Sequence, residues 1–475
     1  MHYHIVGIAG AGMSAIAHVL LDQGHTVSGS DLQRNALAEA LAARGAAILQ
    51  GHAAEHVVGA NAIVITSAVR PHHPEVAAAE AAGLPILKRA DLWRAWSAQR
   101  SIIAVAGTHG KTTTTAMIAL GLLNAGFEPG FLLGGEAPDL PRNARWGNPT
   151  APLVIEADEY DRTFLALTPQ IAVITNIELD HVDIYPTEAD YDAAFRTFAE
   201  AMAHPHNLIM CGDDPGVQRA LAQPAAQQYG IDDNVWRDPV SCRRTLLDWM
   251  AANVRSDATG TSFDIWRYDR QTLSTRSLGP CRIQLSGTHN VRNALAAIAA
   301  LHAAGVAPAQ AIAALAGYRG TRRRFELKGE AGGVTVVDDY AHHPSEARAT
   351  LAAARSRYGN RRIIAYFQPH TYSRTSALLA DWASAFADAD VVLVGDIYAA
   401  RETDTLGLDS ALVAQRLAHP QARAVGSLEQ AAAALRSLMR PGDVILTLGA
   451  GDGYRVGEQI LSDLQTQAVL SAHEG

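Results

Sequence analysis

Short apolar runs recur along the chain, and several of them lead through glycine or polar residues into a segment of helical periodicity. Runs of about four to eight apolar residues are typical of buried parallel strands, and their alternation with helices is typical of α/β domains. Residues 261–268 instead alternate apolar and polar positions, which predicts antiparallel strands. The runs that we predict to be strands are residues 2–8, 25–30, 47–49, 62–67, 84–87, 102–106, 153–155, 171–176, 334–337, 363–367, 391–394 and 444–448.

The strand–helix units fall into three groups, and 475 residues are enough for about two to four domains. We therefore predict an α/β protein of three domains. The first domain, residues 1–100, is predicted to be Rossmann-like. The second, residues 101–317, is predicted to be P-loop ATPase-like with a mostly parallel sheet. The third, residues 318–475, is predicted to be another Rossmann-like α/β domain.

The composition restricts the kind of partner. Hydrophobic residues make up 48% of the chain and the net charge is −9, which is globular and argues against a nucleic-acid-binding surface. The three cysteines form no C-x-x-C pair, which favours a reducing compartment. The apolar stretch near residues 16–21 has no basic segment before it, so we do not interpret it as a signal peptide. Since no apolar run reaches the ~18 residues of a membrane span, we expect a cytoplasmic protein without membrane or nucleic-acid partners.

Residues 107–113 follow a predicted strand and precede a predicted helix, which is the context of a phosphate-binding loop. Backbone N–H groups around Gly107 and Gly110 would face phosphate oxygens, and Lys111 would reach the β- and γ-phosphates. The next residue is a threonine, whose hydroxyl would hold Mg²⁺. The general pattern G-x-x-x-x-G-K-[ST] would place its first glycine at Val105, so the match is imperfect. A tight turn with an incidental lysine is the alternative, but Gly-Lys-Thr-Thr directly after a buried strand favours the phosphate site.

A second glycine-rich loop, residues 7–14, follows the first predicted strand, and Asp31 comes at the end of the second. This is nearly a dinucleotide fingerprint, but Ala9 stands where a glycine should let the backbone approach a pyrophosphate. Three interpretations stay open: a packing motif without ligand, a nicotinamide site, and a site for another pyrophosphate-linked nucleotide. The last fits the shifted glycines at least as well as the second. Ser67 and Arg70 follow a later strand, at the edge where ligands of open α/β sheets bind, although Arg70 could equally be a solvated cation.

Residues 156–161 follow a buried strand and contain four carboxylates. Such groups repel one another unless a cation lies among them, so we favour a metal-binding edge over an acidic surface loop. His181 stands between two aspartates after the next strand and is either a Mg²⁺ ligand or a loop histidine. Because two parallel strands deliver Glu156 and His181 to the edge that carries the phosphate loop, we favour the ligand interpretation.

Further polar groups stand at strand ends and helix starts. Asn290 and Asn293 lie on one face at the start of an alanine-rich helix, where they either cap the helix or contact a nucleotide base. Residues 322–324 are arginines that form either a solvated patch or a clamp on transferring charge. Histidines and an arginine follow strands at residues 338–344 and 367–375. Together these groups predict an ATP-consuming ligase rather than a motor or switch protein.

The order of these motifs resembles that of the Mur ligase family over nearly the whole chain. The matching stretches are residues 7–14, 107–113, 156–161, 176–183, 287–293, 322–325, 338–344 and 367–375. The resemblance implies an ATP-dependent ligase that uses Mg²⁺, with Mn²⁺ possible. Within the family, the chain looks like the members that join L-alanine to the carboxylate of UDP-N-acetylmuramate. Residues 367–375 favour that activity over attachment of a tripeptide in peptidoglycan recycling, whereas Tyr160 is a feature that recycling members can carry.

The resemblance also implies roles for individual residues. Contacts with the UDP-sugar are expected from Gly10, Ala11, Gly12, Met13, Ser14, Asp31, Ser67 and Arg70. Contacts with ATP are expected from Gly107, Thr108, Gly110, Lys111, Thr112, Thr113, His289, Asn290, Asn293, Arg324 and Asp339. The expected metal ligands are Thr112, Glu156 and His181. The amino acid is expected beside Tyr340, His342, His370 and Arg374.

The implied reaction forms an acyl phosphate from ATP and the muramate carboxylate, which the amine of L-alanine then attacks. Lys111 would neutralise charge on the phosphoryl group, and Arg374 would bind the alanine carboxylate. His342 or His370 would accept the amine proton. We expect the third domain to close over the other two in a monomer or weak homodimer. Two other classes stay open: a nicotinamide-dependent dehydrogenase and a UDP-sugar sensor that binds ATP without turnover.

Overall fold

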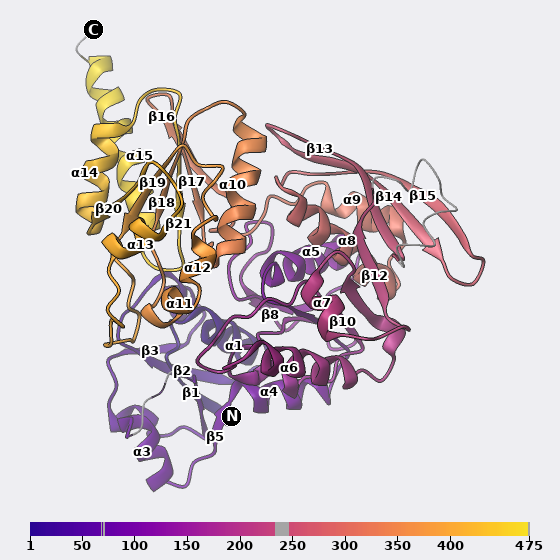
Figure 1. The fold of residues 1–475 in the computed structure, drawn as a ribbon. Coiled ribbons are helices and arrows are strands. Elements are labelled where there is room, and N and C mark those ends of the chain that lie inside the picture. Colours follow the sequence, from indigo (N-terminus) through magenta and orange to yellow (C-terminus); the bar gives the residue numbers. More distant parts are fainter. Residues whose placement is uncertain (68, 70–71, 233–246, 474–475) are drawn as a thin grey trace.

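The computed structural model describes residues 1–67, 69, 72–232 and 247–473 and contains three sheets with flanking helices (Figure 1). The predicted α/β fold with three domains is confirmed. The antiparallel strands predicted near residues 261–268 are also confirmed. Within the described ranges, none of the helices has the length and apolar character needed to cross a bilayer.

The first sheet is parallel throughout, with the strand order β3-β2-β1-β4-β5. Its core is formed by apolar side chains of the strands packed against α1, including the fully buried Ile5, Ile16 and Val27. The elements are β1 His2–Val6, α1 Ala11–Asp22, β2 Thr26–Asp31, α2 Ala36–Ala42, β3 Ala47–Gln50, η1 Ala54–Val57, β4 Ala62–Ile65, α3 Pro74–Ala81, β5 Ile86–Lys88 and α4 Arg89–Ser97.

The second sheet has ten strands in the order β15-β14-β13-β12-β11-β10-β6-β9-β7-β8. Its central strands are parallel and buried on both faces, whereas β13–β15 form an antiparallel extension that projects from the body of the domain (Figure 1). The elements are β6 Ile102–Ala106, α5 Lys111–Asn124, β7 Gly130–Leu132, β8 Ala144–Arg145, β9 Leu153–Glu156, η2 Tyr160–Ala166, β10 Ile171–Ile174, α6 Glu188–Glu200, η3 Pro205–Asn207, β11 Leu208–Cys211, α7 Pro215–Ala220, β12 Gln227–Ile231, β13 Trp249–Asp257, β14 Gly260–Asp269, β15 Ser274–Ile283, α8 Thr288–Ala303 and α9 Pro308–Leu315.

The third sheet has the order β16-β17-β21-β18-β19-β20, and only its edge strand β16 is antiparallel to its neighbour. This domain, drawn from orange to yellow in Figure 1, lies against the other two. The elements are β16 Glu326–Ala331, β17 Val334–Asp339, α10 Pro344–Tyr358, β18 Ile363–Phe367, α11 Tyr372–Ala377, α12 Leu379–Trp382, β19 Val391–Gly395, α13 Ser410–Arg416, β20 Ala422–Gly426, α14 Leu428–Leu438, β21 Val444–Leu448 and α15 Tyr454–His473.

Several predicted strands end too late. The predicted strands 2–8, 62–67 and 171–176 end at Val6, Ile65 and Ile174 in the structure. The remaining residues leave the sheet and form loops at its carboxyl edge. Thr175, for example, is buried yet donates its hydroxyl to His109 O, 2.6 Å away. Thr175 therefore holds the neighbouring loop in place instead of continuing the strand.

Candidate functional site

The loop between β6 and α5, residues 107–113, needs glycine at two positions. Gly107 and Gly110 have φ angles of 134° and 79°, which L side chains rarely adopt. A Cβ on Gly107 would lie 2.0 Å from Thr175 Oγ1, and one on Gly110 would lie 2.6 Å from Asn293 Oδ1. The loop is also tied to the end of β10, because His109 N donates to Asn176 Oδ1 at 2.8 Å. These constraints hold the backbone of the phosphate loop in one conformation.

Lys111 begins α5 and is held inside this loop. Its Nζ donates to Gly107 O at 2.6 Å and to Thr108 O at 3.0 Å, and it lies 2.8 Å from Glu159 Oε2. Burial alone would lower the pKa of Lys111, but the charges of Glu159 and Asp158 raise it. The ammonium group of Lys111 therefore stays charged within the loop.

The acidic edge after β9 is balanced partly by cations of the protein itself. Lys111 pairs with Glu159, and Arg89 Nη1 lies 3.0 Å from Asp158 Oδ2. Glu156 accepts hydrogen bonds from Thr112 Oγ1 at 2.9 Å and from the Gly134 backbone at 2.6 Å. Burial raises the pKa of Glu156, so a nearby cation would favour its charged form.

The predicted metal ligands fall into two neighbouring groups. Thr112 contacts Glu156, whereas His181 Nε2 lies 3.4 Å from Glu159 Oε1. Asp158, Glu159 and His181 each offer a donor atom, and these atoms lie within 4.8 Å of one another. Asp158 and Glu159 were not named as candidate ligands from the sequence, although both lie in the run of carboxylates at residues 156–161.

His109 joins the phosphate loop to the third domain. Its Nδ1 lies 3.2 Å from Glu346 Oε1, and its Nε2 lies 3.2 Å from Glu178 Oε2. Ser345 Oγ donates to the same Glu178 oxygen at 2.5 Å. Burial alone would lower the pKa of His109, but Glu346 and Glu178 raise it to about 9. We call His109, Glu178, Ser345 and Glu346 the interdomain cluster, and none of these four residues was predicted from the sequence to have a role.

A cavity of about 330 Å³ lies beside the phosphate loop. The residues predicted to contact ATP that line it are Gly110, Thr112, Thr113, His289, Asn290, Asn293, Arg324 and Asp339. Gly107, Thr108 and Lys111 belong to the same loop but are not among its lining residues. The cavity is also lined by the interdomain cluster and by Asp213, Arg292 and Phe325, so the second and third domains form it together.

The asparagines at the start of α8 do not cap the helix. The N-cap is Gly287, whose backbone has a φ of 93° and which offers no side-chain hydrogen bond. Asn290 Nδ2 donates to Ser286 O at 2.8 Å, and Asn293 Nδ2 donates to Asn290 Oδ1 at 3.2 Å. The capping interpretation is therefore wrong, and both buried side chains face the cavity.

The arginines of residues 322–324 are paired rather than merely solvated. Arg322 Nε lies 3.1 Å from Glu136 Oε2, Arg323 Nε lies 3.1 Å from Asp338 Oδ2, and Arg324 Nη1 lies 2.9 Å from Glu346 Oε1. Asp339, at the end of β17, accepts hydrogen bonds from the Phe325 and Ala341 backbones, both at 2.8 Å. Burial raises its pKa to about 6.

The four residues expected beside the amino acid lie together after β17 and β18. The rings of Tyr340 and His342 are 5.2 Å apart, and those of His342 and His370 are 6.0 Å apart. Arg374 Nη1 lies 3.3 Å from His370 Nδ1. Its Nε donates to Asp180 Oδ1 at 2.9 Å, which links the third domain to the metal-suited edge of the second.

The two histidines are weaker bases than isolated imidazoles. Burial lowers the pKa of His342 to about 3, although Glu346 opposes this. Burial and then the charge of Arg374 lower the pKa of His370 to about 4. Both rings are therefore neutral at neutral pH, as a proton acceptor must be, but each binds a proton more weakly than an isolated imidazole.

A second cavity, of about 700 Å³, lies at the carboxyl edge of the first sheet. The residues expected to contact the UDP-sugar that line it are Gly10, Ala11, Gly12, Met13, Asp31 and Ser67. The structure does not bring Ser14 to this cavity, because its side chain is buried and accepts a hydrogen bond from Asn143 Nδ2 at 3.2 Å. Arg70 lies outside the described residues. Tyr160 and Arg401 complete the lining from the other two domains.

Three family models match consecutive parts of the chain. Residues 2–101 match the Mur ligase family catalytic domain, residues 105–301 the Mur ligase middle domain, and residues 323–451 the Mur ligase glutamate ligase domain.

Curated relatives match over nearly the whole length. A UDP-N-acetylmuramate–L-alanine ligase of Roseiflexus sp. (strain RS-1) is 62% identical over 98% of this chain and 100% of the relative. A protein of the same name from Chloroflexus aggregans (strain MD-66 / DSM 9485) is 55% identical over 98% of both chains.

Solved structures share the three-domain fold. UDP-N-acetylmuramate-alanine ligase of Thermotoga maritima is 26% identical with a TM-score of 0.81 and covers 98% of this chain and 100% of its own. A murein peptide ligase of Psychrobacter arcticus 273-4 is also 26% identical, with a TM-score of 0.70 and 98% coverage of both chains.

Proposed function

The chain belongs to the Mur ligase family, and on this premise we propose that it is an ATP-dependent ligase that joins L-alanine to the carboxylate of UDP-N-acetylmuramate. The observation that carries the proposal is a continuous series of contacts that leads from the phosphate loop to the third domain. It runs from Lys111 through Glu159 to His181, whose neighbour Asp180 pairs with Arg374. The phosphate loop, the metal-suited edge and the four residues expected beside the amino acid are thus connected.

We place ATP in the 330 Å³ cavity beside the phosphate loop and the UDP-sugar in the 700 Å³ cavity of the first domain. The muramate carboxylate forms a bond to the γ-phosphorus of ATP, and the bond from that phosphorus to the bridging oxygen breaks, releasing ADP. Lys111 is charged and partly buried, so it can neutralise the phosphoryl oxygens. The amine of L-alanine then attacks the acyl carbon, and phosphate leaves.

The hydrogen bonds favour His342 over His370 as the proton acceptor. His342 Nδ1 lies 3.0 Å from Tyr340 O, and because a carbonyl only accepts, this nitrogen carries the proton. Nε2 of His342 then keeps a free lone pair. His370 Nδ1 lies 3.3 Å from Arg374 Nη1, which only donates, so the proton of His370 is on Nε2. Replacing His342 with alanine should therefore slow amide formation more than replacing His370.

The donor atoms fit a hard divalent cation. Carboxylates, a threonine hydroxyl and one imidazole suit Mg²⁺ or Mn²⁺, and the half-buried Glu156 has no ion pair with a cationic side chain among the described residues. We propose that Thr112, Glu156 and His181 hold Mg²⁺ with help from Asp158 and Glu159. When bound, the ion would neutralise charge on the ATP phosphates.

The experiment measures phosphate release from ATP in the presence of Mg²⁺ and UDP-N-acetylmuramate, with L-alanine or the murein tripeptide added separately. Turnover that requires L-alanine is expected. Turnover only with the tripeptide would favour the recycling activity. The tripeptide is the second substrate to test because the fold is also similar to that of a murein peptide ligase. No turnover with either would overturn the proposal.

We further propose that the protein works in the cytoplasm. We also propose that it is a monomer or weak homodimer, because residues of a single chain line both cavities. The domain boundaries at residues 100/101 and 317/318 stay predictions. Sedimentation of the purified chain tests the oligomeric state, and limited proteolysis tests the boundaries.

A further inference from the structure

A second group of histidines surrounds a buried glutamate in the first domain. Glu75 lies in the first turn of α3 and is fully buried. His4 comes from β1, His56 from η1, and His52 and His73 from loops that border the 700 Å³ cavity. We call these five residues the Glu75 cluster. None of them has a role in the reaction described above.

The Glu75 carboxylate is fixed from several sides. Its Oε1 lies 2.7 Å from His56 Nδ1, and its Oε2 accepts a hydrogen bond from Ser30 Oγ at 2.7 Å. Burial alone would raise the pKa of Glu75, but His4, Ser30 and His56 around it lower the pKa to about 2. The group is therefore a carboxylate at neutral pH, in a fixed orientation.

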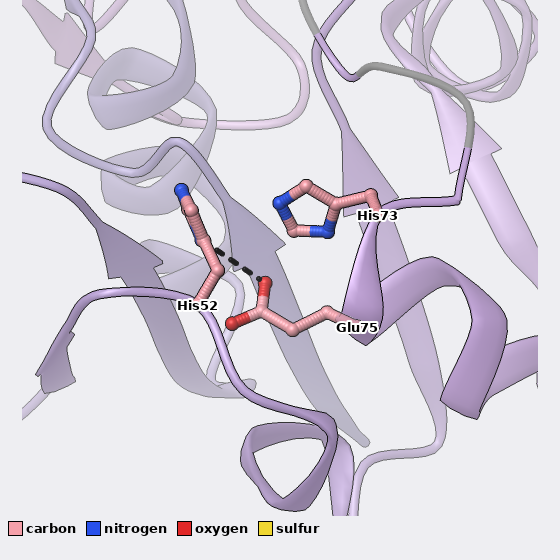
Figure 2. A group of neighbouring side chains, drawn as sticks. All are labelled: His52, His73 and Glu75. Atoms are coloured by element: carbon pink, nitrogen blue, oxygen red, sulfur yellow. Dashed lines mark ion pairs between the residues drawn. The ribbon is translucent and has the colours of Figure 1, made fainter.

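His52 and His73 face this carboxylate from the cavity side. Their ring centroids are 4.5 Å apart, and His52 Nδ1 lies 3.5 Å from Glu75 Oε2. Figure 2 shows the two rings and the carboxylate turned toward a common space. His73 Nδ1 is buried and has no hydrogen-bond partner among the described residues. Burial and the neighbouring His52 lower the pKa of His73, so its ring is neutral and a lone pair is available.

We propose that His52, His73 and Glu75 bind a transition-metal dication of the Zn²⁺ type. One donor atom from each residue lies within 4.8 Å of the others. Zn²⁺–nitrogen bonds of about 2.0–2.1 Å imply donor separations of about 3.3 Å, so the imidazoles must move inward. Both rings border a cavity into which they can turn, although His52 Nδ1 would then exchange its 3.0 Å hydrogen bond with Ser30 Oγ for the metal, whereas the buried Glu75 stays in place.

The donor set also selects the kind of metal. Two imidazole nitrogens and one carboxylate are typical of Zn²⁺, Co²⁺ or Ni²⁺, whereas Mg²⁺ and Ca²⁺ prefer oxygen ligands. His56 lies against Glu75 Oε1, the carboxylate oxygen that faces away from His52. A hydrogen bond of this kind orients a metal-binding carboxylate, and His56 would do so for Glu75. The remaining coordination positions would open to the cavity. This cavity is also where we place UDP-N-acetylmuramate, but the test does not depend on that assignment.

The test uses the full chain without a histidine tag, treated with chelator and free of nucleotide. Zn²⁺ binding is followed by calorimetry, and Co²⁺ binding by the visible absorption of its four-coordinate form. We expect a binding event that excess Mg²⁺ does not displace. It should weaken at least about tenfold in His52→Ala and in His73→Ala. Because both rings border the cavity, these variants should fold, which circular dichroism checks.

Two variants separate this site from the other histidine-containing clusters. His109→Ala removes the centre of the interdomain cluster, and His181→Ala removes the histidine beside Asp158 and Glu159. Both should keep the binding event that depends on His52 and His73. The proposal is overturned if no Zn²⁺ binds, if binding survives both His52→Ala and His73→Ala, or if it is lost equally in His109→Ala or His181→Ala.

Discussion

The two glycine-rich loops of this chain both connect a strand to a helix, and they differ in the charged and polar residues around them. Residues 7–14 and 107–113 each follow a buried parallel strand and lead into a helix. The phosphate loop carries its own cation, Lys111, and is linked to the third domain by His109. The first loop carries no charged side chain, and it is linked to the second domain by neutral hydrogen bonds from Asn143 Nδ2 to Ala11 O and to Ser14 Oγ.

The difference shows that the strand–glycine–helix pattern places the backbone, while neighbouring elements supply the chemistry. Among the residues that the structure describes, the arginines that line the cavity of the first loop are Arg89, from α4, and Arg401, from the third domain. Arg401 reaches this cavity only when the third domain lies against the first, and Arg89 pairs with Asp158 of the second domain, so the positive charge available to an anion there depends on the arrangement of domains. The phosphate loop instead has its cation fixed within its own domain by Glu159. Changes at the two loops should therefore affect different steps, which the following variants test.

Lys111→Ala should have the largest effect. Removing the ammonium group leaves the transferring phosphoryl charge unneutralised and Glu159 without its cation, so turnover should fall by about 10³-fold or more. Phosphate release measures the loss, and calorimetry should find binding of UDP-N-acetylmuramate unchanged. Lys88→Ala, at an exposed lysine, is the matched control and should keep full activity. Equal loss of UDP-sugar binding in Lys111→Ala would mean that the two loops are not independent.

The ion pair between His109 and Glu346, which links the phosphate loop to the third domain, should stabilise the fold in a pH-dependent way. The pKa of His109 is raised from 6.5 to about 9 in the folded chain. A histidine whose pKa is raised on folding stabilises the fold below its unfolded pKa, and this contribution is lost as pH rises through about 9. The difference in unfolding free energy between wild type and His109→Ala should therefore shrink by up to about 3 kcal/mol from about pH 6 to about pH 10.

Thermal denaturation across this pH range measures the effect. His204→Ala, at an exposed histidine of the same domain, controls for removal of an imidazole and should show no such change. A constant difference between wild type and His109→Ala at all pH values would mean that the interdomain cluster does not hold His109 charged.

Paired glycine substitutions should change stability in opposite directions. Gly110→Ala places a Cβ at a φ of 79° and 2.6 Å from Asn293 Oδ1, so it should cost about 1–2 kcal/mol and raise KM for ATP. Gly12 lies within helix α1, where its nearest Cβ contact would be 3.6 Å away. Gly12→Ala should therefore gain up to about 1 kcal/mol and leave KM for ATP unchanged. Urea denaturation and steady-state kinetics measure both, and a destabilised Gly12→Ala would contradict the comparison.

The features that could be predicted from the sequence are those that depend on residues close together in the chain. The α/β fold, the three groups of elements and the loop with Lys111 follow from apolar runs that end in glycine, because strand burial and helix starts leave a mark within a few residues. The positions of Glu156 and His181 at one sheet edge also followed, because parallel strands end on the same side.

The sequence could not predict pairings between distant segments. Glu346 lies 237 positions from His109, which it contacts across a domain boundary, and nothing near either residue marks that contact. The low pKa values of His342 and His370 could not be predicted from the sequence either, because burial by folding is the largest cause of both. Ser14 was expected at the UDP-sugar because it belongs to the loop motif, but the turn of α1 directs it toward Asn143.

Ser14→Ala should have the smallest effect. It tests the uncharged link of the first loop to the second domain, for comparison with the charged link of His109 to the third domain. The change removes the hydrogen bonds of Ser14 Oγ with Ala11 O, at 2.9 Å, and with Asn143 Nδ2, at 3.2 Å. Asn143 keeps a hydrogen bond to Ala11 O at 3.3 Å, so the loss should be about 1 kcal/mol. Since neither partner titrates, the loss should be equal at about pH 6 and about pH 10, unlike that of His109→Ala. Thermal denaturation at both values measures it, and a pH-dependent loss would show that the anchor of the first loop is coupled to the charged one.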